Sequence, residues 1–200
     1  MMHSAPTPDP QSAADPQVIA AARSVAEGRP VLLLQAESGV LTMAGRAVTP
    51  EWVNFLATEG RGLVGIAVTA RRAAELGLTL QPRKGRPDAP LYTQSIEARD
   101  GISTGISAAD RARTILAAEH GTADDIVTPG HVFPQIADED DAAGAALLLL
   151  RLGDAGRVAV LGTILDAAGH TADRATAMAL AEAHGLAVLD LAATAAEHRA

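Results

Sequence analysis

Residues 104–115 read TGISAADRARTI, a stretch that joins small hydroxyl residues to the start of a helix. We expect this helix to run from Ser107 to Glu119 with Ser107 as its N-cap, because serine is a favoured capping residue. The free N–H groups at such a start can meet an anion. Asp110 and Thr114, one turn apart, could grip the hydroxyls of a polyol. The candidate ligand-binding residues are therefore Thr104, Ser107, Asp110, Arg111 and Thr114.

These residues also have a purely structural interpretation. Ser107 and Asp110 have the spacing of a capping-box variant, in which each side chain bonds the backbone N–H of the other residue. Arg111 would then face solvent. The spacing alone favours this structural interpretation, and both interpretations stay open at this point.

A second stretch, PGHVFP at residues 129–134, holds one histidine between two prolines and a glycine. These residues fix the backbone around His131. A rigidly held imidazole can act as a general acid or base near neutral pH, so His131 is the candidate catalytic residue. The alternative is a turn histidine that bonds only a backbone carbonyl.

Apolar periodicity and capping residues predict helices and strands around these two stretches. Helices are expected at residues 17–27, 50–59, 70–76, 107–119, 142–152 and 171–184. Strands are expected at residues 31–34, 40–45, 62–68, 91–98, 157–164 and 186–191. The segment that follows the fourth helix is rich in Gly, Pro and Asp and is read as a loop. The alternation of helices and strands indicates an α/β or α+β protein.

The composition excludes several classes of protein. The formal net charge of −8 argues against a surface that coats nucleic-acid phosphates, and the absence of cysteine excludes disulfides and thiolate chemistry. The longest apolar stretch, residues 142–150, is about half as long as a membrane crossing. Residues 1–16 are polar and proline-rich and are read as a disordered tail, and residues 17–200 as a single domain. We therefore expect a cytoplasmic globular protein with no nucleic-acid and no membrane partner.

Acidic residues are the remaining candidates for a metal site, because oxygen ligands suit hard cations. Asp138 and Asp140 lie in the run DEDD at residues 138–141. Runs of this kind are more often solvated loops than metal sites. No pair of histidines has the spacing of a helical metal site.

Together, the two stretches TGISAADRARTI and PGHVFP resemble the signature core of the 3,4-dihydroxy-2-butanone 4-phosphate synthase family of riboflavin biosynthesis. Weaker similarity extends to VLLL at residues 31–34 and to GHTADRATAMALAEAHGLAVLDL at residues 169–191. The resemblance implies an α+β domain of layered sheet and helices, and a homodimer with its active sites at the subunit interface. It also implies conversion of ribulose 5-phosphate to a four-carbon ketone phosphate and formate, with Mg²⁺ as cofactor.

The chain departs from the family where the family holds metal and phosphate. The acidic loop after the opening strand is reduced to residues 35–39, with Glu37 as its only carboxylate. The Gly-His-Thr-Glu-Ala segment that follows PGHVFP in the family is replaced by DEDDAAG. The essential glutamate of the family falls near Thr163, and its cysteine falls near Gly65. Gly-His-Thr at residues 169–171 imitates the lost segment but belongs to the closing region, so it is not expected to bind metal.

These losses leave three hypotheses. The first, which we favour, is an enzyme that keeps the fold and His131 but is repurposed for a different polyol or carbonyl substrate, because that substrate lacks a phosphate or because the chemistry needs no Mg²⁺. The second is an inactive homologue that binds a metabolite or a partner subunit. The third is residual synthase activity, in which Glu37, Asp138 and Asp140 rebuild an Mg²⁺ site. The expected small-molecule ligand is a polyol or a sugar-derived compound.

Overall fold

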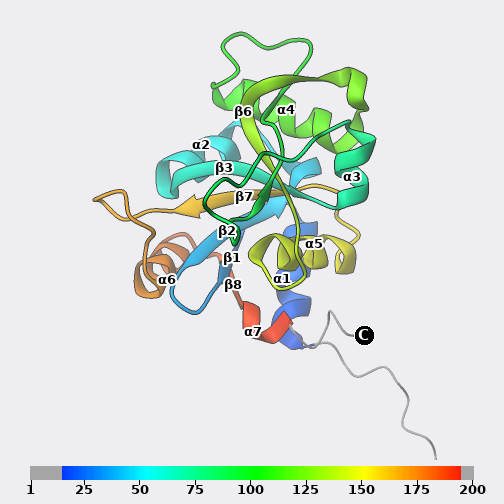
Figure 1. Ribbon diagram of the computed structural model, residues 1–200. Coiled ribbons are helices and arrows are strands. Elements are labelled where there is room, and N and C mark those ends of the chain that lie inside the picture. Colours follow the sequence, from blue (N-terminus) through cyan, green and yellow to red (C-terminus); the bar gives the residue numbers. More distant parts are fainter. Residues whose placement is uncertain (1–14, 195–200) are drawn as a thin grey trace, which may run out of the picture.

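A mixed β-sheet runs through the centre of the computed structural model, which describes residues 15–194 (Figure 1). Its strands in chain order are β1 (Val31–Leu34), β2 (Gly39–Ala44), β3 (Arg61–Val68), β4 (Leu91–Tyr92), β5 (Ile96–Ala98), β6 (Ile126–Ile136), β7 (Ala159–Ile164) and β8 (Ala187–Asp190). The order across the sheet is β4-β6-β3-β7-β2-β1-β8, and β5 pairs with β6 outside this path. The pairs β3–β6 and β1–β8 are parallel, and the other pairs are antiparallel.

Helices cover both faces of this sheet (Figure 1). They are α1 (Pro16–Ala26), α2 (Pro50–Glu59), α3 (Ala70–Glu75), α4 (Ala108–His120), α5 (Ala142–Leu152), α6 (Arg174–Ala183) and α7 (Leu191–Thr194), with short 3-10 turns η1 (Gly45–Ala47) and η2 (Ala123–Asp125). Helices α1 and α5 pack into one core, and α2, α4 and α6 pack into the other. Side chains of a strand alternate between faces, so Leu33 of β1 joins the first core and Leu32 joins the second. Within residues 15–194, no helix combines the length and the apolar character needed to cross a bilayer.

The predicted α+β class is confirmed, and local signals located most helix starts. The side chains of Thr49, Thr69 and Ser107 cap α2, α3 and α4 as expected. Helix α1 begins at Pro16, the last residue of the predicted tail and one residue before the predicted helix start, with Asp15 as its N-cap. Residues 1–14 of the predicted tail lie outside the described residues.

One prediction about the region around His131 is wrong. The segment after α4, predicted as a loop, contains the eleven-residue strand β6. Prolines argue against a strand because they cannot donate to a ladder. Pro129 lies outside the part of β6 that pairs with β3, residues 133–136, and close to the register shift of β5 between Ile96 and Glu97. Pro134 lies opposite Ile66 of β3, and its carbonyl accepts from the N–H of Thr93, which lies between β4 and β5.

Two predicted boundaries also move. The expected strand at residues 91–98 is divided into β4 and β5, which pair with opposite ends of β6. Helix α6 begins at Arg174 instead of Thr171, because Thr171 forms a β-bridge with Leu165 and Asp173 is the N-cap.

Candidate functional site

The two stretches singled out by the sequence meet at a carboxylate from a third segment. Nδ1 of His131 on β6 contacts Oε1 of Glu97 on β5. The side chain of Glu97 is 16% exposed and that of His131 is 45% exposed, so the imidazole is accessible while the carboxylate lies behind it. When Glu97 is ionised and the ring is neutral, the carboxylate can only accept, so Nδ1 would be the donor and Nε2 would keep the lone pair that a general base needs.

Two glycines make room for this pair. Gly105 has a φ of +76°, and a Cβ added there would lie 2.7 Å from Nδ1 of His131 and closer still to the Glu97 carboxylate. A Cβ on Gly130 would overlap the backbone of Ile96 and the side chain of Glu97. The glycines of TGIS and PGH therefore set the geometry of the pair, because each allows the backbone to approach it closely.

The carboxylate of Asp110 holds the loop that carries Gly105. It accepts hydrogen bonds from the backbone N–H groups of Ser103, Thr104 and Gly105 at 3.0–3.2 Å and from the Ser103 hydroxyl at 3.0 Å. Burial acts to raise the pKa of Asp110, but hydrogen bonds from Ser103, Ser107 and the loop backbone outweigh it and lower the pKa to about 2. In this structure Asp110 organises its own loop.

Thr114 and Ser107 also bond to the scaffold. The buried hydroxyl of Thr114 donates to the carbonyl of Asp110 at 2.9 Å and accepts from the N–H of Ala98 at 3.0 Å, which ties α4 to β5. The hydroxyl of Ser107 accepts from the N–H of Asp110 at 3.0 Å, as the structural interpretation predicts. The Asp110 carboxylate bonds the N–H groups of residues 103–105, however, in place of the backbone N–H of Ser107 that a reciprocal capping box would use.

Thr104 and Arg111 differ from the other candidates in that neither side chain has a hydrogen bond to the scaffold described here. Thr104 is exposed on the loop beside Gly105. Arg111 is half-buried, and its Nε is buried without a hydrogen-bond partner, so the expectation that it faces solvent is wrong. Burial lowers the pKa of Arg111.

A small pocket lies close to the pair along β6. Its volume is about 200 Å³, and its polar lining residues are Gln35, Tyr92, Gln135, Asp141 and Thr163. Phe133 lines it as well, and His131 and Phe133 lie on the same face of β6 with a Cα spacing of about 7 Å. The pocket thus begins two residues along β6 from His131, although neither member of the pair lines it.

Asp141 is the N-cap of α5 and the charged group of this pocket. Its Oδ2 accepts from Nε2 of Gln135 at 2.7 Å, and its Oδ1 accepts from the N–H of Gly144 at 2.8 Å. Burial raises the pKa of Asp141 against the lowering effect of these donors. Burial, and then the charge of Asp141, raise the pKa of Tyr92.

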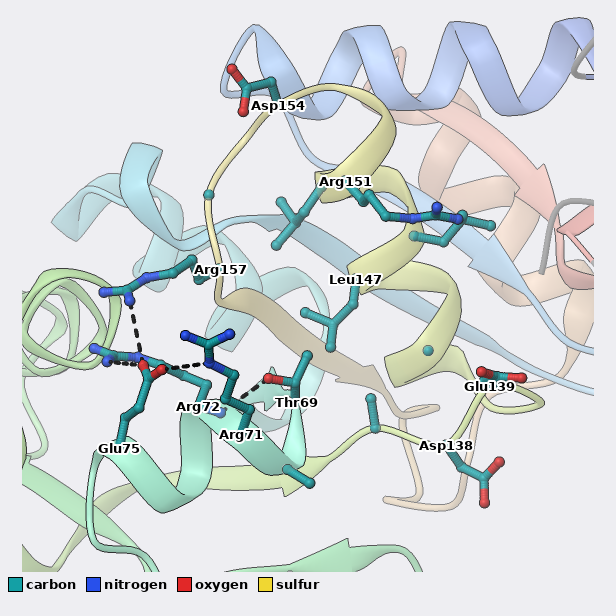
Figure 2. Close-up of a pocket in the computed structure, with 16 residues that line it drawn as sticks. Thr69, Arg71, Arg72, Glu75, Asp138, Glu139, Leu147, Arg151, Asp154 and Arg157 are labelled. Carbon is teal, nitrogen blue, oxygen red and sulfur yellow. Dashed lines mark hydrogen bonds and ion pairs between the residues drawn. The ribbon is translucent and has the colours of Figure 1, made fainter. Parts of the chain in front are cut away.

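A larger cavity of about 930 Å³ lies between α3 and α5 (Figure 2). Glu75 contacts Arg71 at 3.0 Å, Arg72 at 3.1 Å and Arg157 at 3.5 Å. The four arginines of the lining are matched by four carboxylates, so the cavity carries no net charge. Asp138, a candidate metal ligand, lies on the other side of the cavity from Glu75 (Figure 2). We therefore place the candidate site at the Glu97–His131 pair and the pocket beside it.

Comparisons with known proteins agree on one family. The family model described as 3,4-dihydroxy-2-butanone 4-phosphate synthase matches residues 19–196. The chain belongs to the 3,4-dihydroxy-2-butanone 4-phosphate synthase family. A family member from Pseudomonas aeruginosa is 38% identical over 175 residues, which cover 81% of this chain and 48% of that protein. This chain thus spans about half the length of that synthase.

Solved synthase structures share the fold. A two-domain 3,4-dihydroxy-2-butanone 4-phosphate synthase from A. baumannii aligns with a TM-score of 0.82 and 33% identity, over 88% of this chain and 56% of that one. A 3,4-dihydroxy-2-butanone 4-phosphate synthase in complex with two magnesium ions aligns with a TM-score of 0.81 and 27% identity, over 92% and 95% of the two chains. The layered fold expected of the synthase family is confirmed by these likenesses.

Three positions at which the sequence resemblance predicts a departure from the family line the small pocket. Gln35, Gly65 and Thr163, which stand at or near the positions assigned to the family's acidic loop, cysteine and glutamate, all line it. Sequence reasoning did not foresee that Asp141 would join them. Sequence reasoning treated residues 138–141 as one acidic run. Asp141, the last residue of that run, is the N-cap of α5, and in this position it lines the pocket.

This chain's residues do not fit the Mg²⁺ that the synthase family implies. Mg²⁺ needs near-octahedral oxygen ligands, usually with one or two carboxylates. The pocket offers one carboxylate, Asp141, and its other side-chain oxygens belong to the neutral Gln35, Tyr92, Gln135 and Thr163. Glu37, Asp138 and Asp140 are exposed and do not line the pocket. Within residues 15–194, no three His, Cys, Asp or Glu side chains are placed to hold a metal ion.

Sequence reasoning also missed Glu97. It lies 34 residues before His131, and no fixed spacing links the two residues. The available signal was its place in LYTQSIEA, the segment that directly precedes the TGIS loop.

Proposed function

We propose that this protein binds a small polyol or sugar-derived carbonyl compound and that the Glu97–His131 pair transfers a proton on it, without a resident divalent metal. The observation that carries the proposal is the contact between Nδ1 of His131 and the Glu97 carboxylate. A scaffold gains little from a histidine that is 45% exposed, but a base needs that access.

The chemistry follows from the orientation of the imidazole. Nε2 of His131 would take a proton from a carbon next to the carbonyl of the ligand, and the bonding electrons would move to the carbonyl oxygen. The positive charge that develops on the ring would be stabilised by Glu97, as a carboxylate does for a catalytic histidine. Return of a proton from Nε2 would restore the ligand or its isomer, so no oxidant, reductant or metal is required.

Proton exchange is the direct test. The protein would be incubated in D₂O with dihydroxyacetone or erythrulose, and loss of the α-proton signal would be followed by proton NMR. We expect exchange above the buffer rate, and a decrease of about 100-fold or more in His131→Gln, the range for loss of a general base. Glu97→Gln should decrease the rate less, because it leaves the imidazole in place. Equal rates in the wild type and His131→Gln would refute the proposal.

The ordinary synthase reaction is tested in parallel. Formate would be measured after incubation with ribulose 5-phosphate and Mg²⁺, beside an active synthase as control. We expect no formate, because the pocket offers no set of ligands for Mg²⁺. Formate release would mean that the ordinary reaction persists and that the metal-free proposal is wrong.

A second candidate function is supported by the bonds of Asp110, Ser107 and Thr114. Their side chains are engaged with the scaffold, so the polyol grip expected from TGISAADR has few free groups. A non-catalytic homologue that binds a metabolite or a partner subunit fits this observation. It predicts ligand binding without exchange, together with a homodimer or a complex with an active synthase. Light scattering and mild co-purification would measure that assembly.

A further inference from the structure

The lining of the small pocket is almost free of charge. Its apolar walls come from Val40, Leu63, Pro90, Phe133 and Leu161. Its polar groups are two amides, a phenol, a hydroxyl and one carboxylate, and none of its lining residues is Lys, Arg or His. A phosphorylated ligand would therefore meet no cationic side chain and one anion.

The helix N-terminus at the pocket offers no alternative anion site. Free N–H groups at a helix start attract phosphates and carboxylates. At α5, the Asp141 carboxylate already accepts from the N–H of Gly144 at 2.8 Å and from that of Ala143. The protein's own carboxylate thus occupies the position that a phosphate oxygen would need.

The size of the pocket also favours a small ligand without a phosphate group. Its volume of about 200 Å³ is smaller than the roughly 300–1,000 Å³ of common ligand pockets. Apolar walls on one side and Gln35, Thr163 and Tyr92 on the other suit a short carbon chain with hydroxyl or carbonyl oxygens. Amides, phenols and hydroxyls can donate and accept, so each can pair with a ligand hydroxyl.

We infer that this pocket binds an uncharged hydroxy-carbonyl compound of three or four carbons and excludes phosphorylated ligands and Mg²⁺. The identification of this compound as the substrate of the Glu97–His131 pair rests on the proposed function. Binding itself does not.

The test uses a matched pair of probes, dihydroxyacetone and dihydroxyacetone phosphate, with Mg²⁺ as a third. Backbone amide shifts of Gly65, Gly144 and Thr163 in the full chain would report on occupancy of the pocket. We expect dihydroxyacetone to shift these signals, and the phosphate ester and Mg²⁺ to leave them in place at the same concentrations. Shifts by either charged probe at the same or a lower concentration, or no shift by dihydroxyacetone, would overturn the inference.

Two variants locate the binding. Thr163→Val should weaken dihydroxyacetone binding by about 3- to 10-fold, because one hydrogen bond is lost. Thr58→Val, whose hydroxyl bonds within α2, should leave it unchanged. Asp141→Ser keeps a capping oxygen and removes the charge. It should gain at least about 10-fold in inorganic phosphate binding, because the helix N-terminus then no longer holds the protein's own anion. Absence of that gain would refute the role of Asp141.

The two proposals fail in different ways. If dihydroxyacetone binds at the pocket but exchanges no proton, the proposed catalysis is wrong and the pocket assignment stands. If exchange depends on His131 but the pocket signals do not move, the catalysis stands and the pocket assignment is wrong.

Discussion

Replacing Gly105 with alanine should damage the Glu97–His131 pair more than it damages the fold. Gly105 has a φ of +76°, where an L-residue costs about 1–2 kcal/mol. The added Cβ would lie 2.7 Å from Nδ1 of His131, about 0.7 Å short of the 3.4 Å at which ordinary contact begins. Its approach to Glu97 would be closer still, so the pair must separate or the loop must move.

The matched control is Gly85→Ala. Gly85 has a φ of +73°, but an added Cβ there meets nothing within 4 Å. Both variants therefore share the backbone cost, and only Gly105→Ala adds the crowding, which typically costs about 1–3 kcal/mol. That difference corresponds to roughly 2–12 °C in Tm for a chain of this size.

The assays are thermal unfolding and the proton exchange described above. We expect Gly105→Ala to unfold at a lower temperature than Gly85→Ala and to lose about 100-fold or more in exchange rate, as in loss of a general base. Gly85→Ala should exchange at the wild-type rate. Equal Tm values for both variants, or full exchange in Gly105→Ala, would refute the reasoning that Gly105 is required by the pair.

Three further predictions concern the contacts that hold the two ends of α4. Thr114→Val should lower the free energy of unfolding by about 1–3 kcal/mol in urea titrations, because it leaves a buried N–H without an acceptor, and exposed Thr58→Val should change it much less. Asp110, with its pKa lowered to about 2, stabilises the fold above about pH 4 and loses this contribution as the pH falls toward 2. The stability difference between wild type and Asp110→Asn, measured by chemical unfolding, should therefore narrow over that interval, and a constant difference would contradict this. Arg72→Met should cost about 3–5 kcal/mol, because Arg72 is buried and donates to carbonyls at the end of α4, and 89%-exposed Arg71→Met should cost under about 0.5 kcal/mol.

The parts of the fold that sequence reasoning located are those with local causes. A capping hydroxyl accepts from a backbone N–H only three residues further along the chain. Thr49, Thr69 and Ser107 could therefore be assigned as N-caps from the sequence alone. The buried helix α5 was also identified, because a continuous apolar run of this length is typical of an element that is buried in the core.

The parts that it missed depend on contacts between distant segments. Strand β6 was not predicted because it contains two prolines, and the strands that pair with it, β3 and β5, lie elsewhere in the chain. Glu97 could not be linked to His131 because their distance is set by the pairing of β5 with β6. Asp110 was read as a ligand group, but its carboxylate is used by residues 103–105, which no spacing rule connects to it.

At the start of α5, the Asp141 carboxylate, which is attached to the chain, competes with free anions for the same backbone N–H groups. A group attached to the protein beside its own binding position acts at an effective concentration of at least about millimolar. Free phosphate must exceed that value, or bind the helix N-terminus far more strongly than a carboxylate does, before it displaces Asp141 from the N–H of Gly144. Asp141 thus competes with any free anion for the N–H of Gly144. The strength of this competition is set by the geometry of the cap and not by the concentration of a second molecule.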